Sequence, residues 1–267
     1  YHDSGVGINK LEFSNGNEMY FAIFSAFHST VHKQSDDLSF VLTYGDTDYF
    51  VDSGKYNFDE SDEYRKYVRS VFAHNTIIVD NISYDYRETS NIGKSNLYYS
   101  ECNEGFALFQ AKHTIYDGVT INRNVVIIHD KGVFIHDSIE SNSVHDYSQI
   151  FQLGKNVNVE INHTNEMILK SSIDDTSMVL RQLEEVSSYD LFNGSNDPIR
   201  GWRSEYFNQI EPITSVAYYK SDTSTEFRTV IQFDENQLEV KVIEMEDSPL
   251  VYQITVGEDT VLSINLD

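Results

Sequence analysis

Cysteine, proline and positive charge are all scarce in this sequence of 267 residues. The single cysteine, Cys102, excludes an intrachain disulfide and any metal motif built from several cysteines. Three prolines and the lack of low-complexity tracts argue against long linkers. No apolar run approaches the ~20 residues that a membrane-spanning helix needs, and the first residues show no signal-peptide pattern. We therefore expect one domain over residues 1–267, with no membrane partner, as a mature product or excised fragment because methionine is missing at the start.

Basic residues are outnumbered by acidic ones, 19 to 43, which gives a net charge of −24. Such a chain repels phosphate groups, so we expect no nucleic acid partner. An acidic polymer would need a local basic patch, and Arg65, Lys66 and Arg69 could form one directly after the acidic run at residues 59–63. The same segment is equally consistent with a neutralised surface, and the sequence leaves both interpretations open.

Residues that favour β-strands dominate the sequence. The 18 tyrosines and 16 phenylalanines can supply much of a core, and residues 38–44 alternate in the two-residue period of a strand. Short strand candidates continue to residue 266, and no stretch shows a sustained helical period. About eighteen such strands exceed one small sandwich, so we predict an all-β fold, a large two-sheet antiparallel β-sandwich.

Four side chains able to bind ligands or move protons lie at predicted strand ends. His32 and Gln34 precede the alternating run, and in extended backbone they would share one face, roughly 7 Å apart. Asp52 ends a second strand beside a Ser-Gly turn, and His74 begins a third. We expect these four residues to share an open pocket that can hold an ion or a sugar.

Structural roles are the alternative for each of these positions. His32 could be a surface histidine beside a strand. Asp52 and His74 could form a buried hydrogen bond that ties two strands together. Asp36 and Asp37 are expected to serve as a turn and a strand cap.

The same residues occur in three motifs that resemble a known family. Residues 32–40, His-Lys-Gln-Ser-Asp-Asp-Leu-Ser-Phe, resemble the His-x-His-x-Asp-x-x-Ser-Phe signature of the heparinase II/III-like polysaccharide lyases. Residues 51–54 are similar to their Asp-x-Gly strand end, and residues 64–76 to their Arg-Ser-Thr-x-Ala-His-Asn-Thr element. The resemblance is specific over residues 32–80 and thinner beyond.

In that family a helical (α/α) toroid precedes a C-terminal β-sandwich, and the active site lies in the cleft between them. The resemblance therefore implies that this chain is the sandwich domain of a polysaccharide lyase, with the helical toroid half absent from it. The implied reaction is β-elimination at a uronic acid of an acidic polysaccharide, of glycosaminoglycan or alginate-like type. The implied partners are that polysaccharide and the missing N-terminal toroid, and a secreted, periplasmic or cell-surface location is favoured.

Carried over by position, the resemblance assigns His32 to the active-site histidine of the sandwich. An imidazole suits acid–base or carboxylate-neutralising work because it titrates near neutral pH. Tyr67 and Arg69, beside the His74 element, are expected to contact substrate.

The resemblance places Gln34, Asp52 and His74 on three metal-ligand positions, usually those of zinc. Gln34 stands where the family has a histidine, and zinc sites in proteins are built from His, Cys and carboxylate ligands. Two outcomes therefore stay open: zinc bound with Gln34 as a ligand, or a metal-free site in which Gln34 hydrogen-bonds Asp52 or His74.

A second class of function is a non-catalytic carbohydrate-binding or structural β-sandwich derived from the same family. The glutamine at position 34 and the net charge of −24, which is unfavourable for an anionic polymer, favour it. With either function we expect no appreciable turnover by the isolated chain, because the toroid residues are absent.

Overall fold

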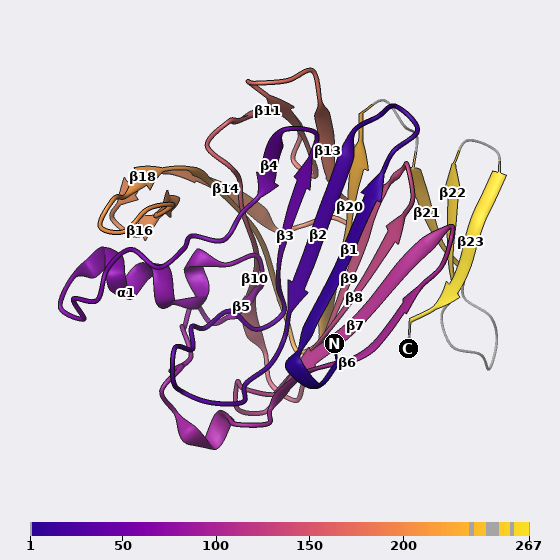
Figure 1. The fold of residues 1–267 in the computed structure, drawn as a ribbon. Coiled ribbons are helices and arrows are strands. Elements are labelled where there is room, and N and C mark those ends of the chain that lie inside the picture. The colour runs from indigo at the N-terminus through magenta and orange to yellow at the C-terminus, as the bar shows by residue number, and fades with distance from the viewer. Residues whose placement is uncertain (1, 235–237, 244–250, 257–258, 267) are drawn as a thin grey trace.

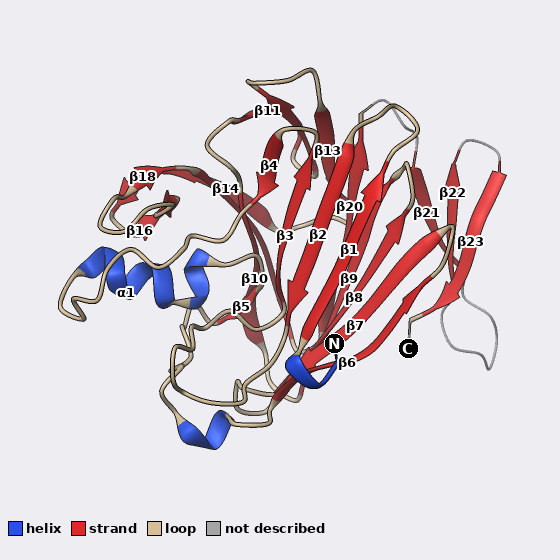
Figure 2. Ribbon diagram, in the orientation of Figure 1, coloured by secondary structure: helices blue, strands red, loops and turns tan. Residues whose placement is uncertain are grey.

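The computed structural model describes residues 2–234, 238–243, 251–256 and 259–266. Strands make up nearly all of its regular structure, and the helices are few and short (Figure 2). Neighbouring strands of the large sheets pair antiparallel. The prediction of an all-β antiparallel fold is confirmed.

The first layer of the sandwich contains two four-stranded sheets, with strand orders β1-β2-β3-β4 and β14-β19-β10-β5 (Figure 1). A bridge between Phe50 and Leu153 and a hydrogen bond from the Val51 amide to the Gln152 carbonyl (2.9 Å) join the two sheets. The strands are β1 (Val6–Glu12), β2 (Glu18–Phe24), β3 (Ser39–Tyr44), β4 (Thr47–Phe50), β5 (Ile77–Val79), β10 (His145–Gln152), β14 (Ser188–Asn193) and β19 (Thr214–Asp222).

The second layer is an eight-stranded sheet of order β11-β12-β13-β20-β9-β8-β7-β6. Its strands are β6 (Ser95–Cys102), β7 (Phe106–His113), β8 (Val119–Ile128), β9 (Gly132–Ser141), β11 (Val157–His163), β12 (Glu166–Ser171), β13 (Ser177–Gln182) and β20 (Thr225–Phe233).

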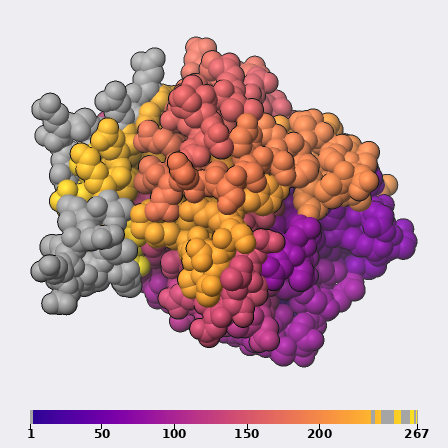
Figure 3. Space-filling view, turned by 180° about the vertical axis from the view of Figure 1, so that it is seen from behind, coloured from indigo at the N-terminus to yellow at the C-terminus, as the bar shows by residue number. Residues whose placement is uncertain are grey.

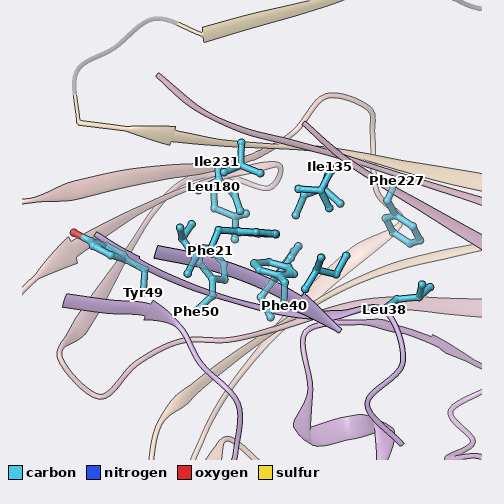
Figure 4. Close-up of a cluster of buried hydrophobic side chains, with 14 of the residues drawn as sticks. Phe21, Leu38, Phe40, Tyr49, Phe50, Ile135, Leu180, Phe227 and Ile231 are labelled. Carbon is cyan, nitrogen blue, oxygen red and sulfur yellow. The ribbon is translucent and has the colours of Figure 1, made fainter. Parts of the chain in front are cut away.

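The main core lies between these two layers. Phe21 of β2 and Phe40 of β3 stack with ring centroids 5.5 Å apart. They belong to the same buried cluster as Ile135, Leu180 and Ile231 of the eight-stranded sheet (Figure 4). Removing such side chains from water is the dominant favourable term in folding. The predicted two-sheet sandwich is therefore confirmed.

A third, smaller layer covers the outer face of the eight-stranded sheet. It consists of β21 (Leu238–Ile243), β22 (Val251–Val256) and β23 (Asp259–Asn265). Tyr252 and Ile254 of β22 pack in one buried cluster with Phe134 and Val230 of the sheet beneath. The sequence pattern does not separate this layer from the two sheets, because period-2 alternation assigns residues to a face but does not say which sheet covers it.

One true helix occurs in the described residues, α1 (Glu63–Arg69). The carboxylate of Asp62 caps it by accepting hydrogen bonds from the amides of Tyr64 (2.8 Å) and Arg65 (3.3 Å). The sequence predicts no helix here, because seven residues are too few to show a sustained helical period. No helix in the described ranges is long and apolar enough to cross a membrane.

The remaining elements are short. They are η1 (His2–Ser4), η2 (Val71–Ala73), η3 (Thr89–Asn91), β15 (Ser195–Asn196), β16 (Ile199–Arg200), β17 (Trp202–Arg203) and β18 (Glu211–Pro212). In Figure 1 the β15–β18 segment lies beside α1, at one end of the first layer. This end carries the segments that the motifs single out.

Candidate functional site

Asn75 fastens the His74 segment to three strands. Its amide group donates to the carbonyls of Phe40 (2.7 Å) and Val51 (3.0 Å). Its side-chain oxygen accepts from the amide of Gln152 (2.5 Å). These bonds satisfy a buried polar side chain completely, which is the usual condition for burying one. His74 is consequently held next to the end of β4, where Asp52 lies.

Asp52 and His74 form a direct hydrogen-bonded pair. The carboxylate accepts from Nδ1 of His74 at 2.7 Å; the imidazole is fully buried, whereas 41% of the Asp52 side chain is exposed. Burial lowers the pKa of His74, but the charge and hydrogen bond of Asp52 outweigh it and raise that pKa above its ordinary value. Burial likewise raises the pKa of Asp52, and the interactions with His74 and the Gly54 amide overcome this and lower it. The pair therefore favours a carboxylate beside an imidazolium.

Gln34 joins this pair through the backbone of Gly54. Asp52 accepts from the Gly54 amide (2.7 Å), and the Gln34 amide group donates to the Gly54 carbonyl (3.4 Å). Gln34 thus bonds neither Asp52 nor His74, contrary to the metal-free arrangement that the sequence suggested. Two buried atoms in this cluster have no hydrogen-bond partner among the described residues: Oε1 of Gln34 and Nε2 of His74.

The donor set does not fit zinc. In the described part of the chain, no three His, Cys, Asp or Glu side chains lie close enough together to hold a metal ion. Gln34, Asp52 and His74 offer one amide, one carboxylate and one imidazole, and the last two are already joined directly at 2.7 Å. Zinc in proteins is bound by four ligands drawn from imidazole, thiolate, carboxylate and water. A strong third protein ligand is missing at position 34.

His32 lies on an exposed turn and not in a strand. Its φ is +59°, in the left-handed region that non-glycine residues rarely adopt. The expectation that His32 and Gln34 share one face of an extended segment is therefore wrong, because the turn reverses the side-chain direction at position 32. Within the described residues, no hydrogen bond or ion pair joins His32 to Asp52 or His74. The structure thus brings together three of the four predicted residues and leaves His32 exposed to solvent.

The neighbour of His32, Lys33, anchors this turn from inside. Its buried ammonium group pairs with Asp37 (2.9 Å) and with Asp36, and lies 5.2 Å from the ring centre of Phe27. Asp37 also accepts from the hydroxyl of Tyr84 (2.7 Å). Asp36 and Asp37 are thus partners of a buried cation and not only a turn and a strand cap, as predicted. The visible signal for this role is a lysine followed three and four positions later by carboxylates.

Asp36 also faces the candidate site. It lines a pocket of about 150 Å³ together with Asp52. Burial raises the pKa of Asp36 more than the Lys33 charge lowers it. Two carboxyl groups with pKa shifts in opposite directions therefore border one small pocket, which is an arrangement typical of functional sites.

Arg69 and Tyr67 are both buried in this structure. Arg69 donates to the Lys33 carbonyl (2.8 Å) and to Glu60 (2.9 Å), and its own carbonyl accepts from the Ser35 amide (3.0 Å). Tyr67 is 5% exposed, and its hydroxyl accepts from the Gly201 amide (3.2 Å). Both side chains are thus used mainly for internal contacts, and Arg69 fixes the backbone that carries His32.

Arg123 supports the site from the core. One of its nitrogens donates to the carbonyls of Leu38 (2.7 Å) and Asn75 (2.6 Å). Leu38 has a φ of +66°, an unusual conformation for a large side chain. The arginine thus holds a strained residue between the His32 turn and β3.

An exposed aromatic pair continues from the Asp52 segment. Phe58 and Phe207 are 61% and 65% exposed, with ring centroids 5.8 Å apart, and the Lys55 ammonium lies 4.2 Å from the Phe58 ring centre. Flat apolar rings beside a cation can stack against sugar rings and attract acidic groups. The pair was not predicted; its one signal in the sequence is two adjacent aromatic residues in the polar stretch 204–209.

Known proteins resemble this chain in sequence and in fold. The family model "Heparinase II/III-like, C-terminal" matches residues 7–243. The comparison with curated proteins returned no match. Among solved structures, a heparinase III with methylated lysines superposes with a TM-score of 0.82 at 17% identity, covering 100% of this chain and 41% of the other.

Two further solved structures agree. The heparan sulfate lyase HepC from Pedobacter heparinus has a TM-score of 0.81 at 16% identity, covering 99% of this chain and 42% of its own. Another heparinase III gives 0.76 at 16% identity, with coverages of 100% and 42%. These likenesses establish the fold, and the chain spans about two fifths of the length of those proteins. With the family model matching most of its residues, this chain belongs to the heparinase II/III-like family, as a C-terminal domain of that family.

Proposed function

We propose that this chain is the C-terminal domain of a lyase that cleaves a uronic-acid-containing polysaccharide by β-elimination. It would supply His32 to a cleft whose other wall is an N-terminal (α/α) toroid. The observation that carries the proposal is the presentation of His32: an exposed imidazole on a left-handed turn, with the residues on its C-terminal side anchored by buried ion pairs and by Arg69.

In this proposal His32 moves a proton at the reacting sugar. β-Elimination removes the C5 proton of the uronic acid and releases the glycosidic oxygen at C4, which leaves with a proton. An imidazole near its titration range can donate or accept either proton. The anchors matter because a group held within hydrogen-bond reach of its proton is far more effective than a mobile one. The remaining acid or base is assigned to the toroid.

The Gln34–Asp52–His74 cluster has a positioning role in this proposal and needs no metal. Its bonds tie the end of β4 to the segment before β5, beside the small pocket that Asp36 and Asp52 line. No step of the reaction is assigned to zinc, because the donor set does not fit that ion.

The test joins the chain to its upstream helical half and follows the absorbance of the unsaturated uronate product. We expect His32→Ala to lower kcat/KM by about 10²–10⁴-fold, the usual contribution of a general acid or base. His28→Ala is the matched control, since His28 is also exposed in the same loop, and it should leave turnover unchanged.

Turnover that His32→Ala leaves intact would refute the assignment of His32. A joined protein that binds polysaccharide but yields no unsaturated product would instead support the non-catalytic carbohydrate-binding alternative, which the glutamine at position 34 and the net charge of −24 favour.

A further inference from the structure

A groove of about 700 Å³ lies on the outer face of the β14-β19-β10-β5 sheet. Its floor consists of residues that point away from the sandwich core, because alternate strand residues face opposite sides. Phe151 and Tyr218 enter the core, whereas Ser148 and Ala217 line the groove. Small side chains on the central strands leave the hollow, which has the usual volume of a small-molecule site.

Aromatic side chains and one arginine form the walls. Phe72 comes from η2, Phe192 from β14, Tyr219 from β19 and Arg200 from β16. The orange segment that includes β15 and β16 lies against the purple segment that includes α1 and η2, seen from behind in Figure 3. None of these residues belongs to the Asp52–His74 cluster.

Arg200 is the unusual member of this groove. The other seven arginines all form ion pairs, whereas Arg200 has no carboxylate partner within the described ranges. Its guanidinium lies 3.6 Å from the ring centre of Phe72 and donates to the Ile199 carbonyl (2.8 Å) and to Asn81 (3.3 Å). A half-buried cation without a counter-charge attracts an anion, and a guanidinium matches a carboxylate in shape.

The other charges of the groove limit how anionic its ligand can be. Lys220 is already paired with Glu184 (3.1 Å). Asp146 and Asp190 are exposed carboxylates on the lining, and Asp190 hydrogen-bonds Tyr219. Two carboxylates repel a densely sulfated polymer but accept hydrogen bonds from hydroxyl groups. The groove thus offers one site for an anion, two acceptors for hydroxyls and aromatic surfaces for an apolar ring face.

We propose that this groove binds a short, unsulfated oligosaccharide through a single uronate unit. The uronate carboxylate pairs with Arg200, the sugar ring packs against Phe192 and Tyr219, and Asp146 and Asp190 accept sugar hydroxyls. The inference goes beyond the proposed lyase function, since it concerns binding on another sheet face and requires no turnover.

The experiment is isothermal titration calorimetry of the chain with an unsulfated uronate-containing tetrasaccharide and with its carboxyl-reduced, neutral counterpart. We expect one site for the acidic tetrasaccharide and about tenfold weaker binding of the neutral one, because a hydrogen bond to a charged group is lost. Arg200→Gln should weaken binding of the acidic sugar by the same factor of about ten. Arg181→Gln is the matched control, as Arg181 is paired with Glu166 on the eight-stranded sheet, and it should bind like the parent.

Ser188→Trp provides a second variant that does not remove charge. Ser188 is exposed on an edge strand and lines the groove, so the indole should fill the hollow and abolish binding while the thermal unfolding midpoint stays unchanged. Binding must also persist with His32→Ala, which separates this site from the proposed active site.

Three results would overturn the inference. The first is no binding at millimolar sugar, and the second is binding that is indifferent to both Arg200→Gln and Ser188→Trp. The third is loss of binding in the protein joined to its helical half, with Tyr219 protected from hydroxyl-radical labelling, which would show that the helical domain covers the groove.

Discussion

Two buried charge pairs in this molecule have opposite characters. Arg123 and Asp137 are both fully buried in the core, and two parallel hydrogen bonds of 2.6 and 2.8 Å join them. Asp52 and His74 are joined by one bond of 2.7 Å at the end of the first layer, with the carboxylate 41% exposed. The first pair is sealed, whereas the second is open on one side.

The difference lies in how completely each pair is satisfied. Arg123 also donates to two backbone carbonyls, and Asp137 also accepts from Gln149 (2.8 Å). His74 keeps a buried nitrogen without a partner among the described residues. A completed polar network makes a core unique and rigid, whereas an incomplete one beside solvent retains a group that can react or bind. We therefore infer that the Arg123–Asp137 pair stabilises the fold and that the Asp52–His74 pair is part of a site.

The largest expected effect comes from breaking the sealed pair. Arg123→Met should lower the free energy of unfolding by about 3–5 kcal/mol, because it leaves the Asp137 carboxylate buried without compensation. Urea unfolding followed by circular dichroism measures this. The double variant Arg123→Met with Asp137→Leu should recover much of the loss, since the buried charge is gone. A single variant that loses under about 1 kcal/mol would show that the pair is not a structural anchor.

Adding a third strong metal ligand to the Gln34–Asp52–His74 cluster should change the stability by an intermediate amount. Gln34→His supplies the missing imidazole beside Asp52 and His74, so this variant should retain about one zinc per chain after dialysis, and the parent little. Zinc at a hundred times its Kd should then stabilise the variant by about 2.7 kcal/mol. Elemental analysis and thermal unfolding with and without chelator provide the measurements, with Gln34→Ala as control. Stoichiometric zinc in the parent would show that glutamine is a sufficient ligand here.

Opening the Asp52–His74 pair should have a smaller and pH-dependent effect. The pKa of His74 is raised in the fold, so the pair stabilises the fold at pH values below the ordinary pKa of histidine. The pKa of Asp52 is lowered, so the pair also stabilises the fold at pH values above the ordinary pKa of aspartate. Both contributions are present from about pH 4 to about pH 6.5; the Asp52 contribution is lost as the pH falls below this window, and the His74 contribution as the pH rises above it. Asp52→Asn should therefore cost about 1 kcal/mol near pH 5.5, after allowing for solvent screening, and less at pH 8.

Asp80→Asn is the comparison variant for Asp52→Asn, and we expect it to have the smallest effect on stability. Asp80 and His145 also lie 2.7 Å apart, and the carboxylate is also 41% exposed, but the imidazole is 18% exposed and not buried. We expect a cost of about 0.5 kcal/mol or less, as for other surface ion pairs. Equal losses in the two variants, measured by urea unfolding at pH 5.5, would mean that burial of the imidazole does not distinguish the site pair.

The site was predictable where a turn signal or a short motif identified its residues. Asp52 at a strand end beside Gly54 follows from the Ser-Gly turn, and the Asp52–His74 hydrogen bond, expected as a structural alternative, is confirmed. The direction of His32 was not predictable, because a single left-handed residue reverses a side chain without a sequence signal such as glycine. Arg69 was expected to contact substrate because it lies beside the His74 element; its hydrogen bonds to the Lys33 carbonyl and to Glu60 could not be predicted, because only the fold brings these groups near.

The sequence alone determined the all-β class and the order of the three motifs, because strand periodicity and short motifs depend on residues a few positions apart. Tertiary structure decided which charges are sealed, which are open and where a groove forms. Arg123 contacts Asn75 across 48 residues of chain, and Arg200 contacts Phe72 across 128. Whether a charge finds a counter-charge is settled by such distant neighbours, so the sealed pair, the open pair and the unpaired arginine could be told apart only in three dimensions.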